Sequence, residues 1–145
     1  RSGERQLTKL SKAMEQYLET IYEIEKGGNI ANVTDIAAAR GVKSPSVTYV
    51  LKKLSDLKLV NRERYNREVS LTKKGRMIAQ RLERTHQTLR WFFEMIGIDS
   101  EVANDDACEI EHIVRPETVD KLTDFVEWVQ STPKAAKYLS EFQSE

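Results

Sequence analysis

Three side chains that can ligate a transition metal stand close together in the run Cys-Glu-Ile-Glu-His. Cys108, Glu111 and His112 occupy positions i, i+3 and i+4. On an α-helix this spacing places all three on one face, where a thiolate, a carboxylate and an imidazole converge. Such a donor set suits a borderline transition-metal ion. A cysteine can also pack as a small hydrophobe, and Glu–His neighbours are common on helix surfaces, so both readings stay open at this point.

Two further observations favour the metal site. The second of only two histidines, His86, lies late on the expected helix that precedes the triplet, so the two helices can be antiparallel neighbours. The first expected helix carries Gln16 and Glu19 at i and i+3, again on one face. Three helices can therefore contribute to one cleft. The candidate metal ligands are Gln16, Glu19, His86, Cys108, Glu111 and His112.

The elements that must position these side chains follow from periodicity and cap signals. Ser11, Thr34 and Ser44 are the expected helix caps, and Pro45 is expected at a first helical position. Asn66 is expected to take the positive φ of a tight turn between two strands. Helices are expected at 10–24, 35–40, 44–57, 72–96, 100–114, 116–130 and 133–142, and strands at 59–64 and 68–71.

This order of elements is that of a winged helix-turn-helix followed by four more helices. The sequence therefore predicts a mainly α fold. Residues 7–73 would form the winged helix-turn-helix DNA-binding domain, and residues 74–145 an all-helical metal-binding and dimerisation domain.

The charge distribution supports this division. The 145 residues have a formal net charge of zero, which taken alone argues against a nucleic-acid partner. However, residues 1–90 hold 19 Lys/Arg and 10 Asp/Glu (net +9), whereas residues 91–145 hold 4 and 13 (net −9). Lys43 to Arg76 alone contains ten basic residues against three acids. The basic half thus suits phosphate and the acidic half suits cations.

In a winged helix-turn-helix, the 44–57 helix would enter the major groove and the wing would contact the flanking backbone or minor groove. A winged helix that binds only proteins is the alternative. The candidate DNA-binding residues are Lys43, Ser44, Pro45, Ser46, Thr48, Tyr49, Lys52, Lys53, Arg62, Arg64 and Arg67.

Other functional classes find little support. No apolar run approaches the roughly 20 residues of a membrane span, and no apolar segment follows the N-terminus, so we expect neither a membrane partner nor a secretory leader. The single Cys108 fits a reducing cytoplasm. His-Glu-x-x-His and Gly-rich phosphate loops are absent, so we expect no enzyme and no small-molecule substrate. A metal-independent regulator that uses Cys108 as a redox sensor is the alternative function.

Five runs of sequence, in order, resemble the metal-dependent repressors typified by the diphtheria toxin repressor and the manganese transport regulator. The likeness covers roughly residues 10–128. The runs are Met14–Tyr22, Val33–Ala37, Ser44–Thr48, Leu71–Gly75 and Asp106–His112.

The resemblance implies a mixed ligand set. Cys108, Glu111 and His112 match the iron-responsive branch, but Gln16 stands where that branch has Met and the manganese branch has Asp. Glu19, His86 and Glu111 match a second site of the manganese branch, whereas the ancillary site of the iron branch fits badly. The thiolate favours Fe²⁺, with Mn²⁺ next and Zn²⁺ or Co²⁺ possible.

The resemblance also implies a homodimer that binds a palindromic double-stranded operator and represses metal-uptake genes when a divalent metal is bound. Longer members of the family add a C-terminal domain resembling an SH3 barrel, for which we expect no counterpart here. The tail, residues 132–145, is expected to be helical and to complete the dimer lobe.

Overall fold

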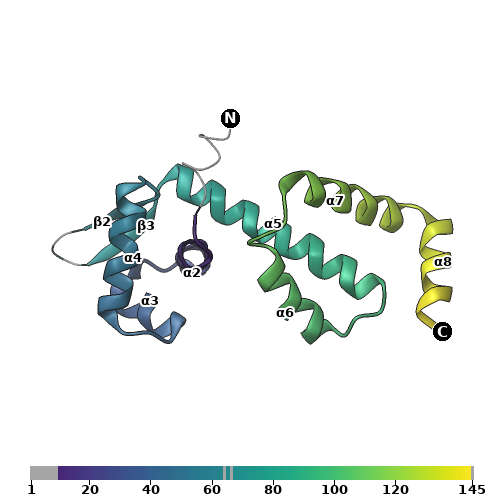
Figure 1. Ribbon diagram of the computed structural model, residues 1–145, viewed down its shortest axis with the longest axis horizontal. Helices are drawn as coiled ribbons and strands as arrows, with labels where there is room; N and C mark the ends of the chain where they lie inside the picture. Colours follow the sequence, from purple (N-terminus) through teal and green to yellow (C-terminus); the bar gives the residue numbers. More distant parts are fainter. Residues whose placement is uncertain (1–9, 64, 66, 145) are drawn as a thin grey trace. The chain divides into compact units, whose positions relative to one another are not determined.

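The computed structural model describes residues 10–63, 65 and 67–144. The chain forms two compact units, Arg1–Arg81 and Leu82–Glu145, and their boundary falls inside a long helix. The described elements of the first unit are α2 (Lys12–Lys26), β1 (Ala31–Asn32), α3 (Val33–Arg40), α4 (Ser44–Asp56), β2 (Val60–Arg62), β3 (Glu68–Leu71) and the first part of α5 (Lys73–Met95) (Figure 1).

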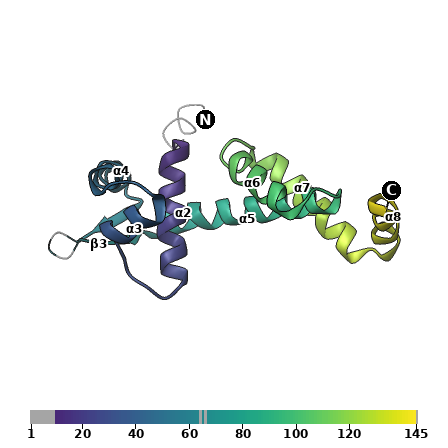
Figure 2. The same ribbon diagram turned by 90° about the horizontal axis from the view of Figure 1, so that it is seen from below.

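Ser11 caps helix α2, as expected, although the helix spans Lys12–Lys26 rather than residues 10–24. The side chain of Ser11 accepts a hydrogen bond of 3.2 Å from the backbone N–H of Met14, and Gly27 occupies the C-cap. Its inner face buries Tyr17, Leu18 and Ile21. Figure 2 shows α2 side-on, with α3 packed against it.

Two of the expected caps are wrong by one or two residues. Asn32, not Thr34, caps α3, because its side-chain oxygen accepts a 2.8 Å hydrogen bond from the N–H of Asp35. Ser44 is already the first residue of α4, and the cap position falls on Lys43, which makes no side-chain cap hydrogen bond. Asn ranks above Thr as an N-cap, so Asn32 agrees with local propensity, whereas at α4 propensity favours Ser44 over the Lys43 that occupies the cap position.

The sheet has three strands rather than the expected two. Strand β3 pairs antiparallel with β2, with Val60 opposite Leu71, and on its other side pairs antiparallel with β1. The short extended stretch before α3 therefore joins the wing as an edge strand. This pairing ties the wing to the start of the helix-turn-helix.

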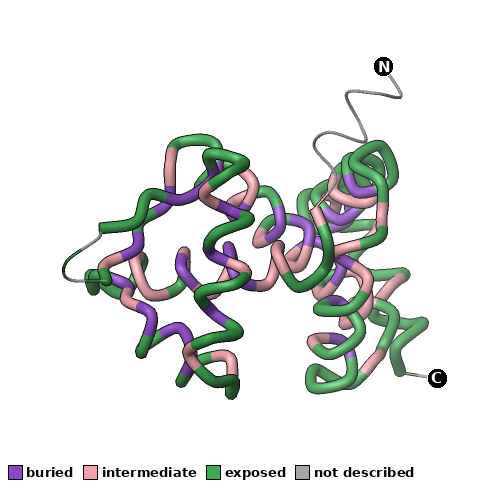
Figure 3. The backbone as a smooth tube through the Cα atoms, turned by 60° about the vertical axis from the view of Figure 1, so that its left-hand side comes forward, coloured by how far each residue is buried: buried purple, intermediate pink, exposed green. Residues whose placement is uncertain are grey.

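The core of the first unit lies between the helices and this sheet. Buried residues alternate with exposed residues along the helices, as amphipathic packing requires (Figure 3). Gly41 takes a φ of 66° between α3 and α4, a conformation that favours glycine and permits the sharp turn. The largest fully buried side chains of this unit are Leu18, Ile21, Ile36, Val47, Leu51, Leu54, Leu59 and Val69.

Gly75 lies where the first turn of α5 crosses the chain that leads into β2. Thr72 Oγ1 accepts from the N–H of Gly75 and donates to the carbonyl of Lys58, which fixes this crossing. A Cβ at Gly75 would overlap the carbonyl oxygen of Leu59. We expect Gly75→Ala to lower the free energy of unfolding by about 1–3 kcal/mol, although Ala is the better helix former.

Thermal or urea denaturation checks this prediction, with Gly27→Ala as the matched control. Gly27 has a φ of −74°, and an added Cβ would meet nothing closer than 3.4 Å. A Gly75→Ala protein as stable as the Gly27→Ala control would contradict the prediction.

The second unit contains the remainder of α5, then α6 (Ser100–Ile110), α7 (Pro116–Ser131) and α8 (Pro133–Ser144). Thr88 on α5 and Thr123 on α7 share a 2.9 Å hydroxyl hydrogen bond, and α7 packs against α8. The tail is helical, as expected. Among the described residues, no helix is long and apolar enough to cross a lipid bilayer.

Candidate functional site

The Cys-Glu-Ile-Glu-His run lies at the C-terminal end of α6, which is shorter than expected. The helix ends at Ile110 instead of near residue 114, and Glu111 is its C-cap with φ −56° and ψ −25°. Residues 111–113 form turns, and Arg115, which directly precedes Pro116, is extended with φ −79° and ψ 149°, as a residue before proline prefers. Cys108 therefore lies in the last turn, while His112 lies in the turn beyond it. Glu111 keeps helical backbone angles, so the i, i+3 relation of Cys108 and Glu111 survives.

Three of the expected metal ligands come together within the second unit. The Nδ1 of His86 on α5 lies 3.8 Å from the Sγ of Cys108 and 3.6 Å from Oε2 of Glu111. All three ligand atoms lie within 4.8 Å of one another. The contacts of His86 on α5 with Asn104 and Cys108 on α6 are therefore what brings a thiol, an imidazole and a carboxylate to one point.

These spacings fit a divalent transition metal. A tetrahedral site with typical bond lengths has ligand atoms about 3.6 Å apart for S and N, and about 3.4 Å apart for N and O. The observed 3.8 Å and 3.6 Å separations differ from these values by only a few tenths of an ångström. The group also mixes soft and borderline donors, as Fe²⁺, Co²⁺ and Zn²⁺ prefer.

Glu111 is the centre of the group. While its Oε2 faces His86, its Oε1 lies 3.5 Å from Nε2 of His112. The side chains of Glu111 and His112 are only 3% and 2% exposed. A carboxylate that faces one imidazole with each oxygen can serve as a ligand on both sides, which agrees with its place in both expected sites.

Asn104 orients His86. Its Oδ1 lies 2.9 Å from Nε2 of His86, an arrangement that suits an N–H on Nε2 and directs Nδ1 toward Cys108 and Glu111. Residues that hold the second nitrogen of a ligating histidine set its tautomer and ring direction. No sequence pattern indicated this role, although Asn104 precedes Cys108 by one helical turn.

We expect Asn104→Ala to weaken metal binding by about 10–100-fold, because the imidazole loses the contact that fixes its tautomer. Asn104→Asp keeps an acceptor oxygen at the same place and is expected to retain most of the affinity. Isothermal titration with Co²⁺ measures both variants. Equal affinities in Asn104→Ala and the wild type would show that Asn104 does not position His86.

Gln16 and Glu19 lie one turn apart on α2, in the first unit. The side-chain oxygen of Gln16 accepts a 3.0 Å hydrogen bond from Arg40 at the end of α3, an interaction that no sequence pattern indicated. Burial raises the pKa of the neighbouring Glu15 to about 7, and the positive charge of Arg81 opposes this shift. This stretch of α2 is thus both polar and partly removed from water.

The expected DNA-reading helix, α4, presents its polar residues to solvent. Lys43, Thr48 and Lys52 are exposed, as DNA contacts must be. The ammonium of Lys53 lies 4.4 Å from the centre of the Tyr49 ring, and its hydrogen bond and charge lower the pKa of the Tyr49 hydroxyl. Both side chains are exposed, so the pair presents a positive charge to solvent.

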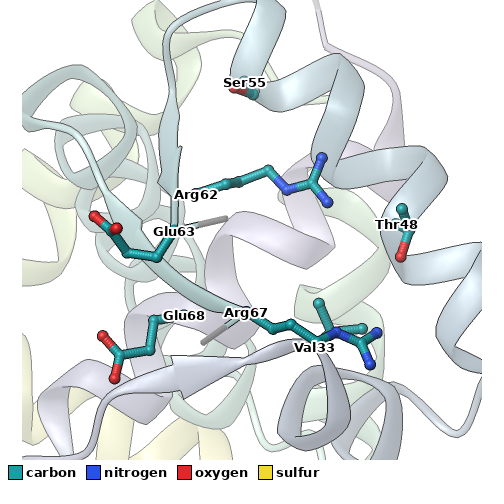
Figure 4. Close-up of a pocket in the computed structure, with 7 residues that line it drawn as sticks. All are labelled: Val33, Thr48, Ser55, Arg62, Glu63, Arg67 and Glu68. Atoms are coloured by element: carbon teal, nitrogen blue, oxygen red, sulfur yellow. The ribbon is translucent and has the colours of Figure 1, made fainter. Parts of the chain in front are cut away.

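A cavity of about 580 Å³ separates α4 from the wing. Arg62 and Arg67 extend into it toward the side where α4 carries Thr48, whereas Glu63 and Glu68 point away (Figure 4). The basic side chains of the wing and the polar side chains of the helix thus face the same space. The expected DNA contact Arg64 and the expected turn residue Asn66 lie outside the described residues. Among the described residues of this turn, Arg67 has a positive φ of 59°.

Comparison with known proteins agrees with both halves of this description. Residues 9–67 match the family described as "Iron dependent repressor, N-terminal DNA binding domain". Residues 72–139 match "Iron dependent repressor, metal binding and dimerisation domain". The HTH-type transcriptional regulator MntR of Bacillus subtilis (strain 168) is 34% identical over 131 residues, which cover 90% of this chain and 92% of that protein.

Solved structures show the same fold. The manganese regulator SloR has a TM-score of 0.68 and 28% identity, and ScaR with bound Zn²⁺ has 0.69 and 28%. Each comparison covers 79% of this chain but 54% of the other, so the chain spans about half the length of these two structures.

The chain therefore belongs to the family of metal-dependent, DNA-binding transcriptional repressors that includes the diphtheria toxin repressor and MntR. The members of this family are regulators and not enzymes. Membership supports binding of a divalent metal, of DNA and of a second copy of the chain. It also decides against the metal-independent alternative that rested on Cys108.

Proposed function

We propose that the chain is a cytoplasmic homodimer that represses metal-uptake genes when a divalent transition metal is bound. The observation that carries this proposal is the group of His86, Cys108 and Glu111, whose ligand atoms lie within 4.8 Å of one another. Residues 7–73 would bind the operator and residues 74–145 would hold the metal and the partner subunit. The proposed operator contacts all lie in the basic half of the sequence, whereas Cys108, Glu111 and His112 of the metal group lie in the acidic half.

The proposed metal ligands are Gln16, Glu19, His86, Cys108, Glu111 and His112. Asn104 orients His86, and Glu111 offers one oxygen to each imidazole. A bound cation supplies the positive charge that this acidic half lacks. Because Gln16 and Glu19 directly precede the helix-turn-helix in the chain, ligation by them would restrict where the recognition helices lie.

Fe²⁺ is the proposed physiological metal, with Mn²⁺ next and Zn²⁺ or Co²⁺ as further candidates. Cys108 contributes a soft thiolate, which favours Fe²⁺, Co²⁺ and Zn²⁺ over Mn²⁺. The amide of Gln16 is a weaker donor than a carboxylate toward hard Mn²⁺. The comparison with SloR, a manganese regulator, keeps Mn²⁺ close behind.

The operator is expected to be a palindrome, because a two-fold symmetric dimer presents two identical recognition helices to two half-sites. The proposed contacts combine a base-reading group at the start of α4 with a phosphate-binding group on α4 and the wing. Those residues are Lys43, Ser44, Pro45, Ser46, Thr48, Tyr49, Lys52, Lys53, Arg62, Arg64 and Arg67.

Fluorescence polarisation tests this function. Duplexes are first selected from a random pool at saturating metal, and their affinity is then measured in chelator, Fe²⁺, Mn²⁺ and Zn²⁺. We expect metal to raise the affinity about 5–150-fold, the range of ordinary allosteric coupling, with Fe²⁺ most effective. Affinity that does not differ between metal and chelator would overturn the proposal, and Mn²⁺ as the best activator would overturn the preference for Fe²⁺.

Lys52→Ala is expected to weaken DNA binding by a similar factor for every sequence and to reduce the slope of log affinity against log salt by about one. Lys52 is exposed on α4, so its ammonium is free to reach a phosphate. Lys134→Ala, an exposed lysine of α8, is the matched control. An unchanged salt slope would remove Lys52 from the DNA interface.

A further inference from the structure

Arg40 and Gln16 form a contact that bears on metal binding. The Nη2 of Arg40 donates to Oε1 of Gln16 at 3.0 Å, and its guanidinium carbon lies 5.7 Å from the centre of the Tyr17 ring. The three side chains lie on α2 and the last turn of α3, within the first unit. The contact thus joins the helix that carries the proposed α2 ligands to the helix that leads into the turn before α4.

The amide oxygen of Gln16 is the only atom of that side chain that can ligate a divalent cation, because the amide nitrogen is a donor. In this structure that oxygen faces a guanidinium, which remains positively charged at any ordinary pH. A metal ion bound to the same oxygen would lie close to this positive charge. Both cations therefore compete for one oxygen.

Arg40 has room to leave. A cavity of about 530 Å³ lies beside it, lined also by Tyr17, Pro45 and Tyr49. The Nε of Arg40 is buried and has no hydrogen-bond partner within the described part of the chain, so the guanidinium is held by part of its donor set only. An arginine held in this way can exchange one acceptor for another at modest cost.

We propose that Arg40 competes with the metal for Gln16, and thereby sets the metal affinity and selectivity of this chain. The inference rests on the proposed function, since it needs a metal site that Gln16 can join. While Arg40 holds Gln16, the remaining donors are the thiolate, the imidazoles and the carboxylates, and softer metals are favoured. Release of Gln16 adds a hard oxygen donor, which benefits Mn²⁺ more than Zn²⁺.

A double-mutant cycle on metal binding, without DNA, tests the proposal. The proteins are the wild type, Arg40→Met, Gln16→Ala and the double variant, and calorimetry gives their affinities for Mn²⁺ and Zn²⁺. Met preserves an apolar side chain of similar length against Tyr17. We expect Arg40→Met to raise Mn²⁺ affinity about tenfold, the equivalent of one charge-assisted hydrogen bond, and Zn²⁺ affinity less. In the Gln16→Ala background, Arg40→Met should change neither affinity.

Equal gains in both backgrounds would overturn the proposal, because Arg40 would then act only through its charge. If Arg40→Met does not raise the Mn²⁺ affinity of the protein that retains Gln16, the proposal is overturned as well. A wild type that binds no metal would instead defeat the proposed function itself, so the two failures are distinguishable. Thermal denaturation in chelator confirms that each variant is folded, and Arg40→Lys, which keeps the charge, should behave more like the wild type than Arg40→Met does.

Discussion

Glu111→Gln is expected to abolish the response to metal while leaving the fold intact. The buried carboxylate of Glu111 faces His86 with one oxygen and His112 with the other, so its charge acts on both imidazoles. Gln has nearly the same shape but removes that charge and places a donor NH₂ where one oxygen was. Substitutions outside the ligand set typically weaken metal binding by about 10–100-fold. The loss of metal affinity in Glu111→Gln should be larger.

The consequence for DNA follows from linkage. The variant in saturating metal should bind operator only as well as the wild type in chelator, a loss of about 5–150-fold relative to the metal-bound wild type. Fluorescence polarisation and a Co²⁺ titration measure the two effects. Glu109→Gln, an exposed neighbour on α6, is the control. Retention of the full metal response in Glu111→Gln would exclude Glu111 from the site.

Trp128→Glu is expected to dissociate the dimer. The rings of Phe92, Phe125 and Trp128 form a continuous series, with centroids 6.2 Å apart at each step. Phe125 and Trp128 nevertheless remain 46% and 56% exposed in the single chain, a surface typical of a protein interface. Buried tryptophans are frequent hot spots of about 2 kcal/mol or more, so the dimer dissociation constant should rise about 30-fold or more.

Analytical ultracentrifugation over a concentration series measures this shift, and Glu127→Ala on the adjacent, exposed position is the control. Operator affinity should fall in parallel, because a single recognition helix reaches only one half-site. A Trp128→Glu protein that remains dimeric at the wild-type concentrations would place the interface elsewhere on the dimerisation domain.

Much of the fold could be predicted because helices and turns leave local signals. Ser11 marks a helix start that the structure confirms, and Gly27 and Gly41 occupy the C-caps of α2 and α3. The third strand could not be predicted, since a two-residue pairing such as that of Ala31 with Val69 depends on residues far apart in the sequence. The early end of α6 was missed because no glycine marks it.

Part of the candidate site could likewise be predicted from local sequence spacing, and part could not. The i, i+3 spacing of Cys108 and Glu111 places them on one face of α6, and the position of His86 on the preceding helix indicated the approach that the structure shows. The hydrogen-bond partners of the proposed ligands could not be predicted from sequence spacing. The hydrogen bond from Arg40 to Gln16 joins residues 24 positions apart and belongs to no helical or strand period.

We propose that metal held at Cys108, His86 and Glu111 drives operator binding. One titration tests this coupling: Co²⁺ is added to the wild-type protein with labelled operator, while the thiolate-to-cobalt charge-transfer absorption and the fluorescence polarisation are recorded together. Both signals should rise with the same midpoint. Operator binding that saturates without the thiolate band, or a complete band without any change in operator binding, would contradict it.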